Sequence, residues 1–230
     1  MTADDQMTIV AARALSNDTR CFVGIGLPSV AANLARRLHA PHCVLIYESG
    51  TIGARPARLP LSIGDGELAD TADSVVSVPE IFNYWLQAGR IEVGFLGAAQ
   101  IDRFGRNNTT VLGDYEQPQV RLPGAGGAPE IAASCPRVIV ILRQSPRAFV
   151  DTVDFVTTAG QPERVITDLG VLEPNPEGEL VLTALHPGVE IETATQATGW
   201  PLKVADPVEK TAPPTRDELT ALRALEAASR

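Results

Sequence analysis

The chain has 230 residues, of which 44% are hydrophobic and 20% are charged, and it carries a formal net charge of −9. This composition predicts a globular protein with a sizeable core. The acidic balance excludes a protein whose main partner is nucleic acid, because phosphate backbones require a basic surface. No run approaches the roughly 18 apolar residues of a membrane helix. The first ten residues, MTADDQMTIV, lack the basic region of a secretory signal, so we expect no membrane contact.

Three cysteines, Cys21, Cys43 and Cys135, lie in or beside apolar runs, and no pair has CxxC spacing. An odd number of thiols without a framework predicts reduced, buried cysteines in a cytoplasmic protein. His39 and His42 lie close together, but no third candidate ligand is near them. We therefore expect no metal site.

The first half of the chain alternates between segments with helical and strand-like patterns. Leu34 and Leu38 have helical spacing, Pro28 suits a first helical turn, and Gly89 suits a helix end. These patterns predict helices at 7–16, 27–40 and 77–89, and strands at 21–26, 43–47 and 91–102.

The second half continues the alternation and then changes character. We expect a helix over 127–134, an apolar strand over 137–142, a hairpin-like pair at 165–174 and 178–188, a short helix over 189–200, a strand over 202–207, and an amphipathic helix over 215–229. Thr215 is a typical N-cap for the last helix. The order of elements predicts an α/β fold, an open and mostly parallel sheet with helices on both faces, in a single domain over residues 1–230.

The segment CVLIYESGTIGARP places a carboxylate, Glu48, directly after an apolar strand. The carboxyl end of a parallel strand is where open α/β sheets bind ligands, and we expect a turn into a helix there. Ser49, Gly50 and Gly53 would let a substrate approach without side-chain collision. The alternative is a solvated turn with an incidental glutamate.

Two glycine-rich segments precede expected helices. LPGAGGAPEIAAS contains Gly124, Gly126 and Gly127, and GIGLPS contains Gly24 and Gly26. Such loops present main-chain N–H groups to negative charge, although many only turn the chain. Neither segment has the GK[ST] of a P-loop.

The loop QIDRFGRNNTT collects hydrogen-bond donors after a strand. Arg103 and Arg106 supply cations, and Asn107 and Asn108 supply amides, although an ordinary surface loop remains the alternative. No serine–histidine–aspartate motif and no HExxH is present. Any nucleophile or base is therefore expected to be a carboxylate.

Taken together, these segments resemble the β subunit of family I coenzyme A transferases. The resemblance is carried in chain order by GIGLPS, YESGTIGA, LGAAQIDRFGRNN, LPGAGGAPEIAAS and the tail GVLEP…LTALHPGV…ATGWPLKVAD. Most of this family has Ser-Glu-Asn-Gly where this chain has Tyr-Glu-Ser-Gly, which is similar to the glutaconate and 3-oxoadipate CoA-transferase branch. The resemblance implies a CoA-transferase or NagB-like fold, a homologous α subunit in an α2β2 assembly, and a place in aromatic compound degradation.

The resemblance also implies a role for each motif. Glu48 would attack an acyl-CoA and become a glutamyl-CoA thioester, with the acid substrate a dicarboxylate such as 3-oxoadipate or glutaconate. The other implied residues are oxyanion donors (Gly126, Gly127 and an amide of Asn108, for which Asn107 could substitute), CoA-binding residues (Gly24, Gly26, Ser49, Gly50 and Gly124) and substrate-binding cations (Arg103 and Arg106). Coenzyme A is a substrate, and no permanently bound cofactor is expected.

Two other functions remain open at this point. One is an acyl-CoA or ring-cleaving hydrolase on the same scaffold, and the other is a non-enzymatic member of the wider fold. Arg55 and Arg58 could also bind substrate carboxylates, or they could hold the α subunit.

Overall fold

The computed structural model describes residues 2–229, and the chain folds as two compact units. Unit 1 comprises the N-terminal segment through Gly97, the short segment Ser134–Arg137, and the segment from Pro213 onward. Unit 2 comprises Ala98–Ala133 and Val138–Ala212. Unit 2 is thus built from chain that lies between the two ends of unit 1. The expectation of a single domain over residues 1–230 stays a prediction.

The strands of unit 1 run in the order β5-β1-β2-β3-β4. β1 pairs in parallel with both β5 and β2, while β3 and β4 add antiparallel strands beyond β2. Phe22 in β1 is in register with Ile46 of β2 and Gly94 of β5, and it is buried as a parallel core strand requires. The bounds are β1 Arg20–Val23, β2 Val44–Ile46, β3 Thr51–Ile52, β4 Ser74–Val75 and β5 Val93–Gly97.

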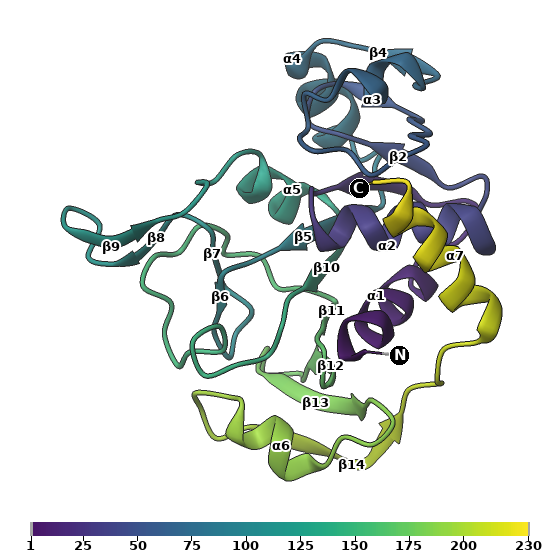
Figure 1. Cartoon of the computed structure of the whole chain (residues 1–230). Helices are drawn as coiled ribbons and strands as arrows, with labels where there is room; N and C mark the ends of the chain where they lie inside the picture. The colour runs from purple at the N-terminus through teal and green to yellow at the C-terminus, as the bar shows by residue number, and fades with distance from the viewer. Residues whose placement is uncertain (1, 230) are drawn as a thin grey trace. The chain divides into compact units, whose positions relative to one another are not determined.

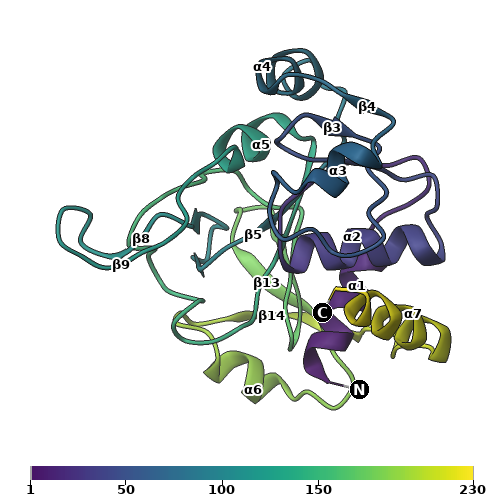
Figure 2. The ribbon, with the colours of Figure 1, turned by 45° about the horizontal axis from the view of Figure 1, so that its top comes forward.

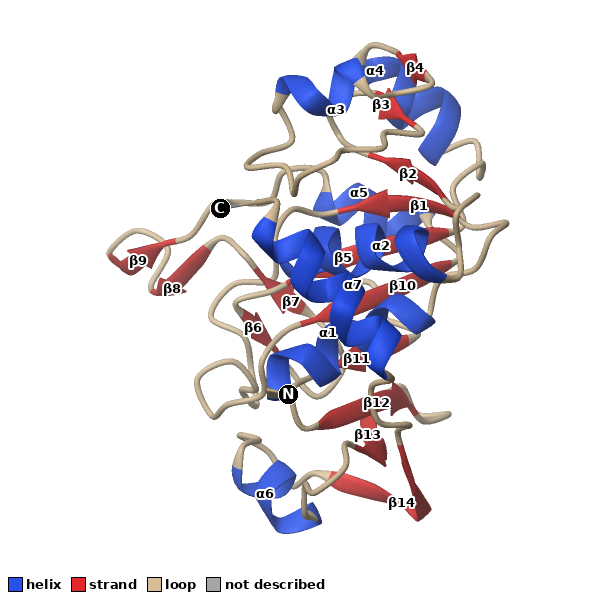
Figure 3. Ribbon diagram, turned by 45° about the vertical axis from the view of Figure 1, so that its right-hand side comes forward, coloured by secondary structure: helices blue, strands red, loops and turns tan. Residues whose placement is uncertain are grey.

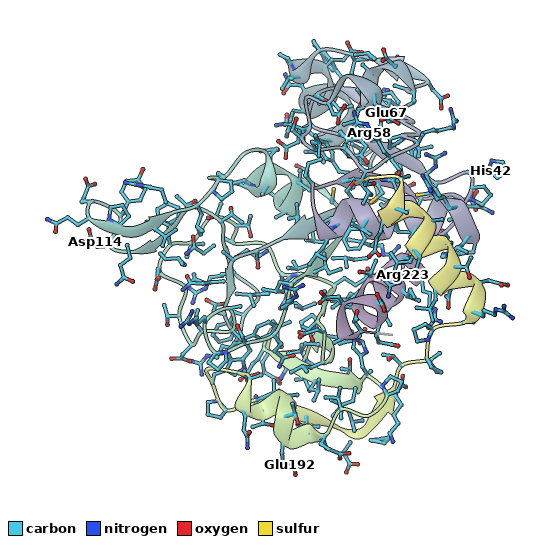
Figure 4. All side chains as sticks on the ribbon, in the orientation of Figure 1. His42, Arg58, Glu67, Asp114, Glu192 and Arg223 are labelled. Atoms are coloured by element: carbon cyan, nitrogen blue, oxygen red, sulfur yellow. The ribbon has the colours of Figure 1, made fainter. Side chains whose placement is uncertain are left out.

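Three helices of unit 1 lie side by side: α1 (Ala3–Arg13), α2 (Leu27–Leu38) and α7 (Arg216–Ala227), as Figures 1 and 2 show. Arg13 of α1 donates to Glu218 of α7 at 2.7 Å, and Arg223 of α7, labelled in Figure 4, pairs with Asp5 at 2.6 Å. These ion pairs join the first and last helices of the chain.

The first helix begins earlier than the expected 7–16. Thr2 caps α1 with its side chain, and the Asp5 carboxylate accepts the Thr2 main-chain N–H. This reciprocal capping fixes the start four residues upstream of the apolar pattern. The same device confirms the predicted cap at the other end of the chain, where Thr215 and Glu218 cap α7.

The helix expected over 77–89 is instead a short α-helix, α4 (Val78–Glu80), that runs into a π-helix, η1 (Ile81–Leu86). Ile81 and Leu86 are both fully buried. Residues five apart lie on different faces of an ordinary α-helix but on nearly one face of the wider π turn. The wider turn therefore buries both side chains, and it packs Phe82 against Phe22 of β1 with ring centroids 5.6 Å apart.

The larger sheet of unit 2 has the strand order β14-β13-β12-β11-β10. β10 and β11 are parallel, β11, β12 and β13 are antiparallel, and β14 is parallel to β13. The bounds are β10 Arg137–Ile141, β11 Arg164–Ile166, β12 Gly170–Pro174, β13 Leu180–Leu185 and β14 Lys203–Lys210, with helices α5 Ala128–Ser134 and α6 Ile191–Gln196. The expected hairpin-like pair is confirmed for β12 and β13, but the strand expected over 165–174 is two strands, since β11 turns back into β12.

The sequence patterns did not predict several short elements. The strand expected over 91–102 is two strands, because β6 pairs with β7 in a separate ladder rather than extending β5. A further hairpin joins β8 to β9 and extends away from β6 and β7 in Figure 1. The bounds are α3 Gly66–Asp70, β6 Gln100–Ile101, β7 Asn107–Asn108, β8 Val111–Gly113 and β9 Pro118–Arg121.

The expected α/β class is confirmed. The central strands β1, β2 and β5 of unit 1, and β10 and β11 of unit 2, are parallel, and helices accompany them (Figure 3). Within residues 2–229, no helix combines the length and hydrophobicity that a bilayer-spanning segment needs. The antiparallel pairs, which join β2, β3 and β4 in unit 1 and β11, β12 and β13 in unit 2, are the main departure from the expected sheet.

Candidate active site

Glu48 lies in the tight turn that joins β2 to β3. The Gly50 N–H donates to the Tyr47 carbonyl at 2.9 Å, and the Tyr47 N–H donates to the Thr51 carbonyl at 3.1 Å. The turn therefore follows the carboxyl end of a parallel strand, as expected, but it leads into an antiparallel strand and not into a helix. The expected strand-to-helix turn is wrong because β3 pairs back onto β2.

Gly50 determines the shape of this turn. Its φ angle is +95°, and an added Cβ would collide with the main-chain carbonyl of Val76. That carbonyl is held close because the Val76 N–H donates to the Gly50 carbonyl at 2.9 Å. Only glycine fits both this φ angle and the available space, so the backbone conformation of the turn is fixed. Glu48 is half-buried on it.

Tyr47 anchors the turn to α2. Its ring is fully buried, and its hydroxyl lies 3.4 Å from the Ser29 hydroxyl and 3.3 Å from the Asn33 amide nitrogen. Burial raises the pKa of the Tyr47 hydroxyl, partly opposed by those two hydrogen bonds. The phenol therefore stays neutral and acts as a structural contact beside Glu48.

Two hydroxyls next to Glu48 have no hydrogen-bond partner within residues 2–229. They are the Ser49 Oγ and the Thr51 Oγ1, and both atoms are buried. Buried hydroxyls are rarely left unpaired, so each such atom needs a physical reason. Ser49 belongs to the expected site, whereas Thr51 was missed because a threonine in a strand pattern carries no distinguishing signal.

Gly24 and Gly26 lie at the start of α2. The Gly24 N–H donates to the Phe95 carbonyl, and a Cβ there would lie 3.2 Å from that oxygen, so Gly24 serves close packing of β1 against β5. Gly26 is the N-cap residue of α2 and opens onto a cavity of about 300 Å³. The cavity is lined by Ile25, Gly26, Ser29, Val30, Leu59, Pro60, Leu61 and Ser229. Ser29 thus connects this cavity to Tyr47.

Asn107 and Asn108, in unit 2, differ in what their amides contact. Asn108 is fully buried, and its Nδ2 donates to the Gln100 Oε1 at 2.7 Å and to the Val111 carbonyl at 2.6 Å. Its Oδ1 accepts from the Thr110 and Val111 N–H groups. The Asn107 side chain makes no hydrogen bond with the described residues, and its Oδ1 is buried.

The glycine-rich loop lies beside these asparagines. The Gly124 N–H donates to the Thr109 carbonyl, and the Thr109 hydroxyl donates to the Gly124 carbonyl, both at 2.9 Å. The Gly126 N–H has no acceptor within the described part of the chain, and the Gly127 carbonyl accepts from Ile131 in the first turn of α5. Unit 2 therefore brings together the predicted residues Asn108, Gly124, Gly126 and Gly127.

The arginines expected to bind substrate are paired with carboxylates. Arg106 donates from Nε to the fully buried Asp102 at 2.6 Å. Arg103 lies 3.9 Å from Asp151 and stacks over Phe104. In unit 1, Arg55 makes a two-bond pair with Asp73, and Arg58 pairs with Asp65 and Glu67. Each guanidinium thus has a protein counter-ion already.

The two units, each taken by itself, offer different chemistry. No group of three metal-binding side chains occurs within residues 2–229. Unit 1 has a half-buried carboxylate on a glycine-constrained turn, and a carboxylate can act as a nucleophile in acyl transfer. Unit 2 has asparagine amides and main-chain glycine N–H groups, which are donors of the kind that stabilise oxyanions.

Residues 5–197 match the family model described as coenzyme A transferase. The chain belongs to the coenzyme A transferase family. It corresponds to the β subunit of these enzymes, since the 3-oxoadipate and glutaconate CoA-transferase chains that align along most of its length are the second of two subunits.

Comparison with individual CoA-transferases gives the same result. The chain is 57% identical to the B subunit of 3-oxoadipate CoA-transferase from Pseudomonas knackmussii, covering 98% of this chain and 94% of that protein. It is 32% identical to the B subunit of glutaconate CoA-transferase from Acidaminococcus fermentans, covering 92% and 88%. The crystal structure of the latter enzyme superposes with a TM-score of 0.90 at 27% identity, covering 98% and 94% of the two chains.

One relative has a different activity. A component of a cholesterol ring-cleaving hydrolase, IpdB of Rhodococcus jostii, is 31% identical over 75% of this chain and 79% of that protein. A CoA-transferase-like chain can therefore belong to a hydrolase, and the chemistry of this chain has to be argued from its own residues.

Proposed function

We propose that the chain is the β subunit of a CoA-transferase that moves CoA from succinyl-CoA to 3-oxoadipate through a thioester on Glu48. The observation that carries the proposal is the position of Glu48, half-buried on a glycine-constrained turn at the carboxyl end of a parallel strand. The substrate is inferred from the 57% identity to a 3-oxoadipate CoA-transferase chain.

The first half of the reaction makes a mixed anhydride. A Glu48 carboxylate oxygen attacks the acyl-CoA carbonyl carbon, and the carbon–sulfur bond breaks to release CoA thiolate. The thiolate then attacks the glutamyl carbonyl carbon, and the carbon–oxygen bond of the anhydride breaks to release the acid. The product is a glutamyl-CoA thioester, which an incoming acid returns to acyl-CoA by the reverse steps.

Little proton transfer is required, because thiolate and carboxylate are both good leaving groups. What each tetrahedral intermediate needs is a set of donors for its oxyanion, and losing one such donor typically costs about 3 kcal/mol. The Gly126 N–H, which has no protein acceptor among the described residues, suits this role, and Gly127 follows it. This assignment rests on the resemblance to the family.

The side-chain donor is assigned to Asn107. Both amide hydrogens of Asn108 go to Gln100 and Val111, whereas the Asn107 amide has no described partner. Asn108 then acts as a positioning residue that holds the loop. This assignment uses the alternative that the sequence left open.

The arginine pairs modify the expected substrate contacts. Arg106 and Arg103 reach a dicarboxylate only in competition with Asp102 and Asp151. The ion pair of Arg103 is longer and more exposed than that of Arg106. An acid substrate can therefore bind Arg103 at a smaller loss of ion-pair free energy.

The proposed assembly is α2β2 with a homologous α subunit, in the cytoplasm. The partner is supported by the two relatives that are each one component of a two-component enzyme. Three free cysteines, Cys21, Cys43 and Cys135, are compatible with a reducing compartment. Purified β chain that transfers CoA at full rate without a partner would contradict the assembly.

Covalent trapping tests the proposal. The assembled enzyme is treated with succinyl-CoA and then with hydroxylamine or borohydride, and its peptides are analysed by mass spectrometry. We expect modification of the peptide containing Glu48 in the wild type and not in Glu48→Gln. An unmodified Glu48 peptide under turnover, with hydrolysis of the thioester, would place the hydrolase first.

A further inference from the structure

A second cavity in unit 1 is lined mainly by cations. It has a volume of about 260 Å³ and lies between the last turns of α2 and the segment that follows β3. Its lining consists of Asn33, Arg36, Arg37, Arg55, Pro56 and Ala57. None of the sequence motifs for transfer contains Arg36 or Arg37.

The cavity arginines are held by main-chain oxygens, which fixes their position. Arg36 Nη1 donates to the Ala54 carbonyl at 2.8 Å, and Arg37 Nη2 donates to the Ala57 carbonyl. A guanidinium has five N–H donors, so most donors of both residues remain available. Arg36 is half-buried and Arg37 is exposed, and both line the cavity.

The positive charge of the cavity is only partly balanced. Arg55 has Asp73 as its counter-ion, but no carboxylate of the described residues is within ion-pair distance of Arg36 or Arg37. The contrast with Arg58 is direct, because Arg58 is enclosed by Asp65 and Glu67, the latter labelled beside it in Figure 4. The net charge of the lining with Asp73 is therefore about +2.

The environment of Arg36 is unfavourable for its charge. Burial first, and then the neighbouring positive charge of Arg55, lower the pKa of the Arg36 guanidinium. A bound anion would relieve both effects, because it would replace lost hydration and screen Arg55.

Stabilisation of the helix end does not account for the arrangement. Cations in the last turn of a helix commonly interact with its own terminal carbonyls. Here Arg36 and Arg37 bond instead to Ala54 and Ala57, which lie outside α2, and so they line a cavity between two segments.

We propose that this cavity is a binding site for a phosphate-type dianion. Guanidinium groups bind oxyanions through paired N–H donors. Three of them around one small cavity match a compact anion whose oxygens surround a single centre, better than a dicarboxylate whose charges are separated by a carbon chain. The net charge of about +2 matches two negative charges. The site is independent of the proposed transfer reaction.

Titration calorimetry of the full chain with sodium phosphate, at constant ionic strength set by sodium chloride, tests the site. Arg36→Met and Arg37→Met keep most of the aliphatic stem and remove the charge. We expect each to weaken phosphate binding about tenfold or more, since each removes charge-assisted hydrogen bonds. Arg216→Met is the matched control, because Arg216 is exposed and has no described side-chain contact. It should bind phosphate as the wild type does.

Three results would overturn the proposal. They are no saturable phosphate binding by the wild type, an equal loss of affinity in Arg216→Met, and tighter binding of succinate than of phosphate. Because binding is measured without substrate, failure of the transfer reaction would not affect the outcome.

Discussion

The Glu48 turn and the Asn108 loop are both rigid, but different parts of the chain supply the rigidity. In the turn, the main chain is constrained by Gly50 and by its hydrogen bonds with Tyr47 and Val76. In the loop, the constraint is a side chain, the four-bonded amide of Asn108. Gly124, in the glycine-rich loop that is hydrogen-bonded to Thr109, would admit a Cβ without meeting any atom within 4 Å.

The difference follows from what each region has to present. In the proposed reaction the nucleophile is the Glu48 side chain, and the turn fixes the main chain that carries it. The Asn108 amide fixes the main chain of Thr110 and Val111, close in sequence to Asn107, the proposed side-chain donor. Pre-organisation of either kind lowers the reorganisation needed in the transition state.

The largest expected effect is on the nucleophile. Glu48→Gln keeps the size of the side chain and removes the anion, so CoA transfer should fall by several orders of magnitude while the fold is retained. Glu80→Gln is the control, because Glu80 is also half-buried in unit 1 and its side chain has no described contact. Transfer rates and thermal unfolding of both variants are measured. Substantial CoA-transfer activity in Glu48→Gln would contradict the assignment of Glu48 as the nucleophile.

The backbone constraint is tested by matched glycine substitutions. Both Gly50 and Gly124 have positive φ angles, +95° and +103°, so alanine is strained by about 1–2 kcal/mol at either position. At Gly50 the added Cβ also meets the Val76 carbonyl, and the total loss should reach about 4 kcal/mol. Urea unfolding of Gly50→Ala and Gly124→Ala measures the difference. Equal losses would show that the turn is no more constrained than the loop.

Paired asparagine variants separate positioning from donation. Asn108→Ala removes four hydrogen bonds to Gln100, Thr110 and Val111 and should lower the free energy of unfolding by about 3 kcal/mol. Asn107→Ala should change stability little and lower kcat by about 100-fold. Denaturant titrations and steady-state kinetics are needed for both. A kinetic defect confined to Asn108→Ala would return the donor role to Asn108.

The ion pair that joins α1 to α7 predicts an acid-dependent stability of unit 1. Arg13 lowers the pKa of Glu218 to about 2, from a usual value of about 4.5. The unfolded chain therefore takes up a proton that the folded chain does not, and stability is lost as pH falls from about 4.5 to 2. At neutral pH, Glu218→Gln should cost about 1–2 kcal/mol, and it should flatten this pH dependence. An unchanged slope would show that other carboxylates dominate.

The smallest effect is expected from a buried histidine of unit 2. Burial lowers the pKa of His186, whose nitrogens lie 2.7 Å from the Thr167 carbonyl and 2.8 Å from the Thr211 hydroxyl. The contribution of His186 to the free energy of unfolding should be fully present above about pH 6.5. It should decrease as pH falls toward the lower folded pKa, because only the unfolded chain gains the proton in that range. Unfolding of wild type and His186→Gln between pH 7.5 and 5 measures it. If the free energies of unfolding of the two proteins change equally with pH, another group is responsible for the pH dependence.

The sequence predicted elements whose signals are local. The Thr215 cap and the apolar strand at 137–142 were confirmed because a capping residue and an apolar run are each visible within a few positions. β3 and β4 were not predictable, since each has two residues and exists only through pairing with a neighbour. The π-helix over Ile81–Leu86 depends on burying two faces at once, which no helical periodicity indicates.

The candidate site shows the same division. Glu48, Gly50 and Gly53 were singled out from the motif, and their roles stay predictions; the structure adds that Glu48 is half-buried on a tight turn. The neutralisation of Arg106 by Asp102 corresponds to an (i, i+4) spacing in the sequence, a local signal for an ion pair. The saturation of Asn108 and the charge of Arg36 were not predictable, because each depends on contacts with Val111, Gln100 or Ala54 that only the fold creates.

The contact between helices α1 and α7 affects the order in which the two units can fold during synthesis. Unit 1 needs α7, and its ion pairs Arg13–Glu218 and Arg223–Asp5 close only after residues near the end of the chain have left the ribosome. Unit 2 has all of its residues by Ala212. During synthesis, the inserted unit can therefore complete its fold first, while α1 and β1 wait for a helix that is translated about 200 residues later.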